Sequence, residues 1–180
     1  MIRGTKVDLV AVSSEYTDYY SRWINDPEVT DMLGDPNIPL SKGKEREWVE
    51  SVLSGKGGGR TFTILTKKGE PIGNAGFNHL DFRNSHGVLG IMIGEKRLWD
   101  KGFGTDAIRI LLKFGFDELG LRKIELFLDP GNKRALACYR KCGFVEEGRA
   151  RKHIFHRGEY IDDLRMGILR EEWLRHLKKK

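Results

Sequence analysis

The sequence predicts a single α/β domain of the α+β kind, with a central, mixed and mostly antiparallel sheet of about seven strands and helices on both faces. Its 180 residues are enough for one compact domain with a core, whereas two domains would be cramped. Strand-like runs follow one another across short turns, which favours antiparallel pairing. One mostly apolar helix separates two further strands, and a crossover of that kind makes its two strands parallel.

The first third of the chain is predicted to contain one strand and three helices. The Ser13-Ser14 pair provides a helix cap, and Asp26-Pro27 ends or redirects the helix that begins there. Prolines and a glycine then interrupt the chain. The expected elements are a strand over 6–12, a helix over 14–25, a short helix with an irregular loop over 27–40, and a helix over 41–53.

The remainder is predicted to hold a three-stranded meander, the parallel crossover and a hairpin. Apolar residues occupy most of the circumference of the crossover helix, which indicates burial, and Gly120 ends it. Gly143 ends the following helix. The expected elements are strands over 60–66, 71–80 and 86–93, a helix over 105–119, a strand over 123–128, a helix over 133–142, hairpin strands over 144–155 and 159–169, and a C-terminal helix from about 170.

Composition and charge exclude several classes of protein. The net charge of +6 includes a basic tail at residues 178–180, but no module with interleaved aromatic and basic residues indicates nucleic-acid binding. No run approaches the ~18 apolar residues of a membrane span, and no apolar leader opens the chain, so we expect a cytoplasmic protein without a membrane partner. The two cysteines, Cys138 and Cys142, are too few and too close for a disulfide framework or a metal site.

The loop between residues 94 and 105 predicts an anion site. It joins an apolar strand to a helix, and the first N–H groups of a helix have no intrahelical partners and lie at the positive end of its dipole. Gly102 and Gly104 remove side chains that would keep a phosphate oxygen away from those N–H groups. The loop therefore predicts a phosphorylated ligand, although such a glycine pair by itself is equally typical of a turn.

Further motifs follow this loop in a fixed order, and together they carry a family resemblance. They are Trp99-Asp100-Lys101-Gly102-Phe103-Gly104, then Asn132-x-x-Ala135-x-x-x-Tyr139-x-x-x-Gly143-Phe144, then Glu146-Glu147-Gly148-x-x-Arg151, Gly158-x-Tyr160-x-Asp162-x-x-x-Met166 and Glu172-Trp173. Over nearly its whole length the chain resembles the GNAT superfamily of acetyl-CoA-dependent N-acetyltransferases. Its C-terminal part looks like the branch that contains ribosomal-protein N-terminal alanine acetyltransferases and spermidine acetyltransferases.

The resemblance implies a binding site for acetyl-CoA as cosubstrate. The pyrophosphate would lie on the N–H groups of residues 101–105, the pantetheine arm would run along the strand at 91–93 where the two parallel strands splay apart, and Asn132 would bond an amide of the ligand. Taken alone, Asn132 is also a typical helix cap. The implied cofactor-binding residues are Ile91, Met92, Ile93, Trp99, Lys101, Gly102, Phe103, Gly104, Thr105, Asn132 and Lys141.

The same resemblance implies that Tyr139 protonates the departing thiolate after direct attack by the amine in a ternary complex. With a tyrosine pKa of ~10 and a thiol pKa of ~8.5, that transfer is uphill by only about 2 kcal/mol. Many relatives carry a glutamate base where this sequence has Val88, so that role is not carried over. His86 lies on the same strand face two residues earlier and is the candidate base, with His79 and a water chain as alternatives.

Other interpretations remain open. Residues 102–107 also satisfy the dinucleotide fingerprint, but that fingerprint requires glycine directly after the strand and several parallel strands, which disfavours an NAD-binding protein. An acyl-CoA-binding sensor or scaffold without catalysis would keep the loop. Tyr139 alone is typical of a half-buried core tyrosine, and His86 alone of a solvated turn.

The acceptor is predicted only as a primary amine. Neutralising an amine of pKa ~10.4 at pH 7 costs about 4.6 kcal/mol, against about 1.4 kcal/mol for an α-amine near 8, so a site without a glutamate base favours a protein N-terminus. Acidic residues at 26, 28, 31 and 35 instead favour a cationic, polyamine-like acceptor, unless they form a solvated loop. The hairpin and the C-terminal helix could support a homodimer.

Overall fold

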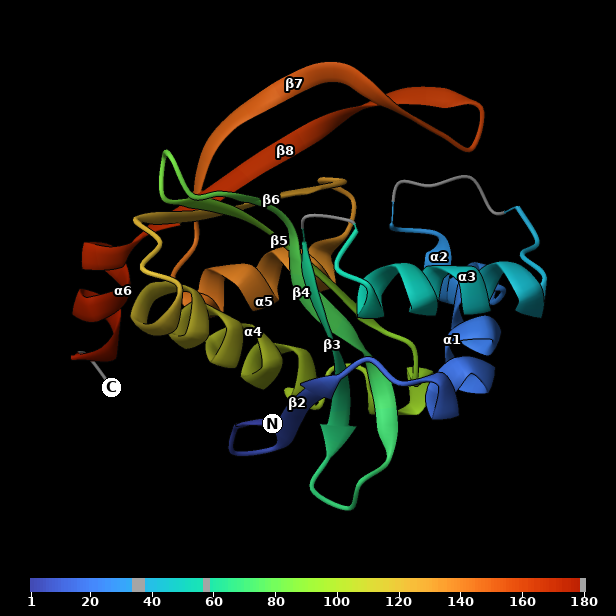
Figure 1. Ribbon diagram of the computed structural model, residues 1–180. Coiled ribbons are helices and arrows are strands. Elements are labelled where there is room, and N and C mark those ends of the chain that lie inside the picture. Colours follow the sequence, from blue (N-terminus) through green and yellow to red (C-terminus); the bar gives the residue numbers. More distant parts are fainter. Residues whose placement is uncertain (34–37, 57–58, 179–180) are drawn as a thin grey trace.

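A computed structural model describes residues 1–33, 38–56 and 59–178 of the chain (Figure 1). The N-terminal part contains β1 (Ile2–Arg3), β2 (Val7–Ala11), a 3-10 turn (Ser14–Tyr16), α1 (Thr17–Ile24), α2 (Pro27–Thr30) and α3 (Lys42–Leu53). The middle contains β3 (Arg60–Thr66), β4 (Pro71–Asp81), β5 (His86–Ile93), a 3-10 turn (Lys96–Leu98) and α4 (Phe103–Lys113), continued by a π-helical turn (Phe114–Glu118). The last part contains β6 (Lys123–Leu128), α5 (Lys133–Cys142), β7 (Val145–His156), β8 (Glu159–Leu169) and α6 (Arg170–Leu177).

The described strands form one mixed sheet in the order β1-β2-β3-β4-β5-β6-β8-β7. Every neighbouring pair is antiparallel except β5 and β6, which are parallel, so the predicted mixed and mostly antiparallel sheet is confirmed. The sheet has eight strands rather than about seven. The additional strand is β1, whose two residues pair with Leu9 and Asp8 and are too few to give a periodic signal in the sequence.

The boundaries of the helices differ from the predictions where a glycine or a change of helix type intervenes. The predicted helix over 14–25 begins as a 3-10 turn and becomes α-helical at Thr17. The crossover helix starts at Phe103, two residues before its predicted start, because Gly102 adopts the left-handed conformation and acts as its N-cap. Its last turn, from Phe114, is π-helical. Helix α5 and strand β8 match their predicted bounds.

Two separate apolar clusters hold helices against the sheet (Figure 1). The larger one packs α4, α5 and α6 against the strands and includes the fully buried Leu111, Ile124 and Phe116. The smaller one lies between the sheet and α1–α3 and includes Tyr20 and Trp23, both about 1% exposed. Because the helices are held on both faces by different clusters, the predicted helical layers on both sides of the sheet are confirmed.

The parallel pair holds together only at its beginning. Strands β5 and β6 pair from His86 and Lys123 to Val88 and Glu125, and no register continues beyond these residues in either described strand. Beyond this point β5 remains paired with β4, and β6 with β8. The two strands therefore form a V that is closed at residues 88 and 125 and open toward their C-terminal ends.

In the view of Figure 1, the β7–β8 hairpin lies above the other strands of the sheet. Strand β7 is the sheet edge and is exposed along nearly all of its length. Its register shifts between Ala150 and Ile154, and Lys152 has a positive φ of 53°, features that disfavour pairing with another chain.

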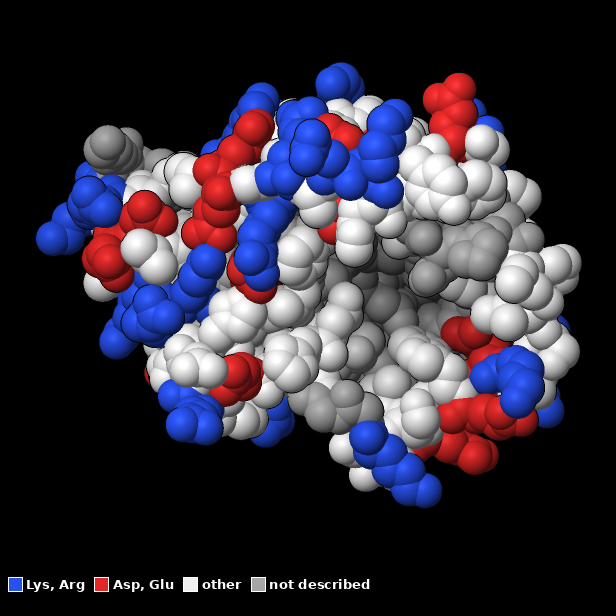
Figure 2. All heavy atoms as spheres, turned by 90° about the horizontal axis from the view of Figure 1, so that it is seen from above, with Lys and Arg blue, Asp and Glu red and all other residues white. Residues whose placement is uncertain are grey.

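Figure 2 looks onto this face and shows Lys and Arg side chains gathered beside a hollow in the surface. The predicted homodimer through this hairpin and the C-terminal helix stays a prediction. Within the described ranges, no helix has the length and apolar character needed to span a membrane.

Candidate active site

The loop before α4 leaves backbone N–H groups available to a ligand. Gly102 has a φ of 83° and provides no side chain to cap the helix. The N–H of Asp106 bonds the carbonyl of Gly102, whereas the N–H groups of residues 103–105 have no backbone acceptor in the described chain. Because the helix dipole adds positive potential at this end, the loop has the geometry of an anion site.

No contact within the protein requires glycine at position 104. A Cβ at Gly104 would lie 3.6 Å from Ile93 Cγ1 and 4.0 Å from Ile91 Cδ1, which are ordinary contacts, and its φ is not positive. Glycine inside a helix costs roughly 0.5–1 kcal/mol relative to alanine. The open position in front of the first helical turn therefore fits the close approach of a ligand better than any need of the fold.

Cationic side chains from three segments surround the loop. The indole N–H of Trp99 donates to the carbonyl of Ile93 at 2.7 Å, and the guanidinium of Arg134, on α5, lies 3.7 Å from the centroid of the same indole ring. The ammonium of Lys6 donates to the carbonyl of Lys101 at 2.7 Å. The positive charges of Lys6, Lys101 and Arg134 therefore add to the potential of the helix N-terminus.

Asp106 fixes the N-terminal segment against the first turn of α4. Its buried carboxylate accepts hydrogen bonds from Thr5 Oγ1 at 2.7 Å and from the N–H groups of Lys6 and Val7 at 2.8 and 3.0 Å. Burial favours the neutral acid, but these hydrogen bonds outweigh it and lower the pKa of Asp106. Its ionised side chain thus has a structural task and holds Lys6 beside the loop.

The edge of β5 that faces the V has no strand partner. Ile91, Met92 and Ile93 pair with Ala75, Asn74 and Gly73 of β4, and within the described strands none of them pairs with β6. Ile91 and Ile93 pack against the larger apolar cluster, and Met92 against the smaller one. Their backbone groups on the open side are therefore able to pair with an extended ligand, as the family resemblance implied.

The start of α5 lies against the start of α4. Asn132 is the N-cap of α5, and its Oδ1 accepts a hydrogen bond from the N–H of Ala135 at 3.0 Å. The interpretation of Asn132 as a helix cap is therefore confirmed. Thr105 Oγ1 and Cys138 Sγ lie 3.1 Å apart. The Cys142 thiol donates to the carbonyl of Thr105 at 3.7 Å. Neither cysteine forms a disulfide in the described chain.

Three further predicted cofactor-binding residues lie around this junction. Lys101 and Lys141 are exposed and enter no ion pair among the described residues. Phe103 is half-buried, with the ammonium of Lys6 5.8 Å from its ring centroid. The pKa of Cys138 is lowered chiefly by its contact with the Cys142 side chain, then by Thr105 and by the charges of Lys141 and Arg109.

Tyr139 lies on α5 and is 7% exposed. Its ring packs edge-on against Phe144, with centroids 5.8 Å apart. Its hydroxyl has no hydrogen-bond partner in the described chain, and burial raises the pKa of Tyr139, followed by smaller contributions from Cys138 and Cys142. The phenol therefore stays protonated at neutral pH, and its raised pKa makes it a weaker acid than an exposed tyrosine.

His86 meets a charged residue that the sequence analysis missed. At the closed end of the V, His86 Nε2 lies 2.9 Å from Glu125 Oε1, and Arg165 Nη2 lies 3.0 Å from the same oxygen. Val88 is the last β5 residue that pairs with β6, and its partner is Glu125. Glu125 is 3% exposed. The only signal in the sequence was a glutamate between the apolar Ile124 and Leu126 of this strand, and strand periodicity alone does not reveal its partners.

A second group of charged residues lines a cavity of about 130 Å³ at the open end of β6. Asp31 is held there by Arg157, at 2.9 Å between Oδ1 and Nη2, and His156 Nε2 lies 3.6 Å from the same carboxylate. Asp163 Oδ1 is buried without a hydrogen-bond partner, and burial raises the pKa of this carboxyl. The cavity is lined by Asp31, Met32, Leu33, Phe127, Leu128, Asp129, Ile154, His156 and Asp163.

Of the acidic residues considered for the acceptor that the structure describes, only Asp31 lines this cavity. Asp26 Oδ2 and Glu28 Oε2 each lie 2.8 Å from Lys96 Nζ, and ion pairs of this exposed kind contribute little stability. Asp35 lies outside the described residues. His79, the alternative base, is opposite Val88 in the register of β4 and β5.

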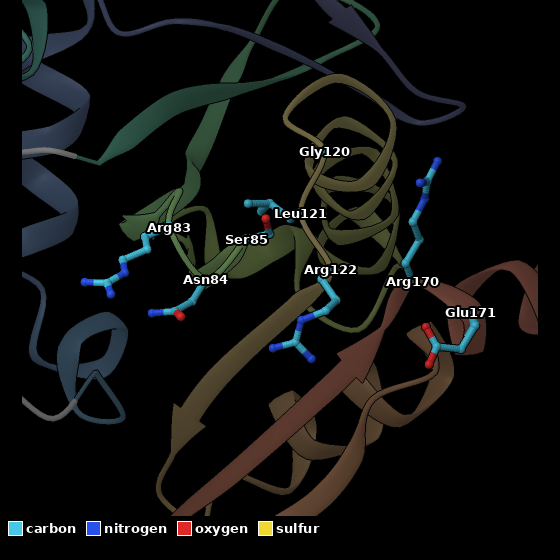
Figure 3. Close-up of a pocket in the computed structure, with 8 residues that line it drawn as sticks. All are labelled: Arg83, Asn84, Ser85, Gly120, Leu121, Arg122, Arg170 and Glu171. Atoms are coloured by element: carbon cyan, nitrogen blue, oxygen red, sulfur yellow. The ribbon is translucent and has the colours of Figure 1, made fainter.

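A larger cavity of about 540 Å³ lies at the opposite end of the sheet and contains no predicted site residue. It is formed by the β4–β5 turn, the segment before β6 and the start of α6 (Figure 3). Figure 3 shows the side chains of Arg83, Arg122 and Arg170 pointing in different directions rather than toward one point. Its geometry therefore does not indicate a single bound group.

The fold and the loop together define the class of protein. The acetyltransferase (GNAT) domain family matches residues 7–145, and the chain belongs to this family. It is an acyltransferase of the N-acetyltransferase type, whose family cosubstrate is acetyl-CoA. The dinucleotide-binding alternative is thereby set aside.

Similar proteins support the predicted branch. An uncharacterised N-acetyltransferase, p20, of Bacillus licheniformis is 29% identical over 93% of this chain and 95% of its own length. The spermidine N(1)-acetyltransferase of Escherichia coli K12 is 36% identical over 41% of this chain and 40% of its own length. The crystal structure of spermidine N-acetyltransferase from Vibrio cholerae in complex with CoA and spermine has a TM-score of 0.86 at 24% identity, covering 94% of this chain and 98% of that one.

Proposed function

We propose that this protein transfers the acetyl group of acetyl-CoA to a primary amine that carries a second positive charge, a small polyamine-like acceptor. The observation that carries the choice of acceptor is the cavity at the open end of β6, which is lined by three aspartates and one histidine. It lies three residues along β6 from Glu125, which is about 10 Å at the usual strand rise. A chain-like diamine is able to place one nitrogen in the V and the other in this cavity.

The cofactor side of the proposal uses the loop and the V. The N–H groups of residues 103–105 would hold the pyrophosphate, with Lys6, Lys101 and Arg134 around it. The unpaired edge of β5 at residues 91–93 would hold the pantetheine arm and direct the thioester toward the closed end of the V. Asn132 retains its side-chain N–H groups for an amide of the ligand while its oxygen caps α5.

Two residues would move protons in the proposed reaction. The acceptor enters as an ammonium ion and loses one proton to His86 before its nitrogen attacks the thioester carbonyl. The N–C bond forms, the C–S bond breaks, and Tyr139 donates a proton to the departing thiolate. The second proton released by the nitrogen restores the Tyr139 hydroxyl through solvent, and His86 returns its own proton to water.

The acidic cavity supports a cationic acceptor over a protein N-terminus. Asp163 Oδ1 is buried without a partner, which is costly unless a ligand donates to it or the carboxyl is protonated. An ammonium group supplies three N–H donors and a positive charge at one point. A peptide N-terminus has no second charge at a fixed distance from its amine, so this cavity would add nothing to its binding.

A matched pair of amines tests this proposal. We expect release of free CoA from acetyl-CoA in the presence of 1,4-diaminobutane, and at least about tenfold lower kcat/KM with 1-aminobutane, which lacks the second charge. Acetylation of an alanine-initiated peptide in preference to the diamine would contradict the choice of acceptor. Calorimetric binding of CoA without acetylation of a diamine, a monoamine, an aminoglycoside or a peptide would instead favour the sensor interpretation.

A further inference from the structure

The deeply buried carboxylate of Glu125 lies among cationic groups at the closed end of the V. The Glu125 side chain is 4% exposed, and its Oε1 is within 2.9 Å of His86 Nε2 and 3.0 Å of Arg165 Nη2. Lys123 Nζ lies 3.5 Å from its other oxygen but only 2.6 Å from Glu147, which is therefore the main partner of Lys123. His86 and Arg165 are thus the groups that Glu125 serves, and they meet at one oxygen.

The contact determines which nitrogen of His86 is available. Nε2 faces the carboxylate without a linear hydrogen bond, so the approach at 2.9 Å is electrostatic in this conformation. Among the described residues, Nδ1 has no hydrogen-bond partner. A neutral imidazole carries its proton on one nitrogen, and an adjacent carboxylate favours the tautomer protonated on the nitrogen that faces it. Nδ1 is then the nitrogen with a free lone pair.

We propose that Glu125, held in place by Arg165, is a positioning residue that fixes His86 in the Nε2–H tautomer and stabilises the imidazolium formed when Nδ1 takes a proton from the acceptor. The inference rests on the proposed function of His86 as the base. Glu125 itself is not assigned as the base, because Arg165 and Lys123 already lie against its two carboxylate oxygens. Its effect on the reaction is through the charge of the imidazole, in the arrangement known from other enzymes where a carboxylate orients a catalytic histidine.

The proton balance of the step is simple. The N–H bond of the acceptor ammonium breaks, its electron pair stays on nitrogen, and the proton joins Nδ1 to give an imidazolium beside the Glu125 carboxylate. The neutral amine then attacks the thioester. After the transfer, Nδ1 releases its proton to water, and Glu125 gains or loses no proton in the step.

Other charged groups face His86 from the neighbouring strands. Asp81 is its partner in the register of β4, and its carboxylate accepts hydrogen bonds from Asn84. Lys123 is its partner in the register of β6, and Glu147 on β7 pairs with Lys123. Arg165 on β8 shares the oxygen of Glu125. Of the carboxylates in the described chain, Glu125 alone lies within ion-pair distance of the imidazole.

Kinetics of matched variants test the inference with 1,4-diaminobutane as acceptor. We expect Glu125→Gln to lower kcat roughly tenfold or more and to move the acidic limb of the pH profile to lower pH, while the KM for acetyl-CoA changes less than about twofold. His86→Gln lowers kcat further, and adding Glu125→Gln to it has no additional effect, because the carboxylate acts only through the imidazole. Glu147→Gln is the control: it neutralises a nearby carboxylate that does not contact His86 and leaves kcat and the limb unchanged.

Two results would overturn the inference. One is a Glu125→Gln variant that folds, binds CoA and keeps both the kcat and the pH profile of the unaltered protein. The other is a ¹⁵N imidazole spectrum of the unaltered protein in which His86 is the Nδ1–H tautomer at high pH. The spectrum needs no turnover, so it separates this inference from the proposed function, whose failure would appear as the absence of acetylation with every amine.

Discussion

The two sides of the V between β5 and β6 differ in what they offer a ligand. On the cofactor side, the contacts are backbone N–H groups at the start of α4, the unpaired edge of β5 and the glycine at 104. On the acceptor side, the contacts are charged side chains, Glu125 with His86 and the aspartates of the cavity. A backbone site recognises a constant group, such as a pyrophosphate, whereas side chains are replaced easily and set the choice of acceptor. Under the proposed function, the backbone of the fold would determine the cofactor, and replaceable side chains would determine the acceptor.

The largest expected effect tests Tyr139, the proton donor of the proposed reaction. We expect Tyr139→Phe to lower kcat about 100-fold or more, because the departing thiolate loses its proton donor, while CoA affinity changes little. Steady-state turnover and calorimetric titration with CoA measure the two quantities. Phe144→Leu, which alters the ring that packs on Tyr139 but removes no hydroxyl, is the matched control for packing. Equal turnover for Tyr139→Phe and the unaltered protein would assign Tyr139 to the core alone.

A second prediction tests whether the cofactor side works through backbone. We expect Gly104→Val to weaken CoA binding roughly 100-fold, which is about 2.7 kcal/mol, because the side chain would occupy the space in front of the first helical turn. Gly104→Ala, whose Cβ meets no atom closer than 3.6 Å, should leave the melting temperature nearly unchanged. Gly148→Val is the control, because that glycine has no atom within 4 Å of its Cβ position and lies on the exposed β7. Unchanged CoA affinity in Gly104→Val would move the cofactor away from this loop.

Segments whose conformation is local in sequence were predictable, whereas contacts between distant segments were not. The loop at 99–105, α5 and the β7–β8 hairpin are local in sequence, and their glycines and turn residues predict their conformations directly. The acceptor side brings together Asp31, Glu125 and Asp163, which lie on three segments far apart in the chain. The register of β6 against β5 and β8 places Glu125 and Asp163, and the ion pair with Arg157 holds Asp31. No pattern within one segment carries that information. Likewise, β1 was missed because two residues carry no periodicity.

A third prediction acts on the acceptor side alone. We expect Asp163→Asn to raise the KM for 1,4-diaminobutane about tenfold and to leave the kcat/KM for 1-aminobutane nearly unchanged, because only the diamine has a second charge to place in the cavity. Asp162→Asn is the control, since Asp162 is the next residue in β8 and its carboxylate instead accepts the N–H of Lys152 at 3.0 Å. If both variants change the two amines equally, the cavity does not select the acceptor.

The smallest effect concerns the junction of α4 and α5, where the cofactor side includes a side chain with unusual chemistry. The contact with the Cys142 side chain is the largest influence on Cys138, and with Thr105, Lys141 and Arg109 it outweighs burial and lowers the pKa of the Cys138 thiol to about 7. A lowered thiol pKa means that the thiolate forms as pH rises through about 7, rather than near the usual 8.5.

We therefore expect iodoacetamide to modify Cys138 roughly five- to tenfold faster at pH 7 than it modifies an unperturbed thiol, because the gain in thiolate is partly offset by weaker nucleophilicity. Saturating CoA should slow this reaction by covering the first turn of α4, as peptide mass spectrometry would measure. Modification at equal rates with and without CoA would show that Cys138 lies outside the covered surface, and the cofactor side would then be limited to the backbone of the loop and the edge of β5.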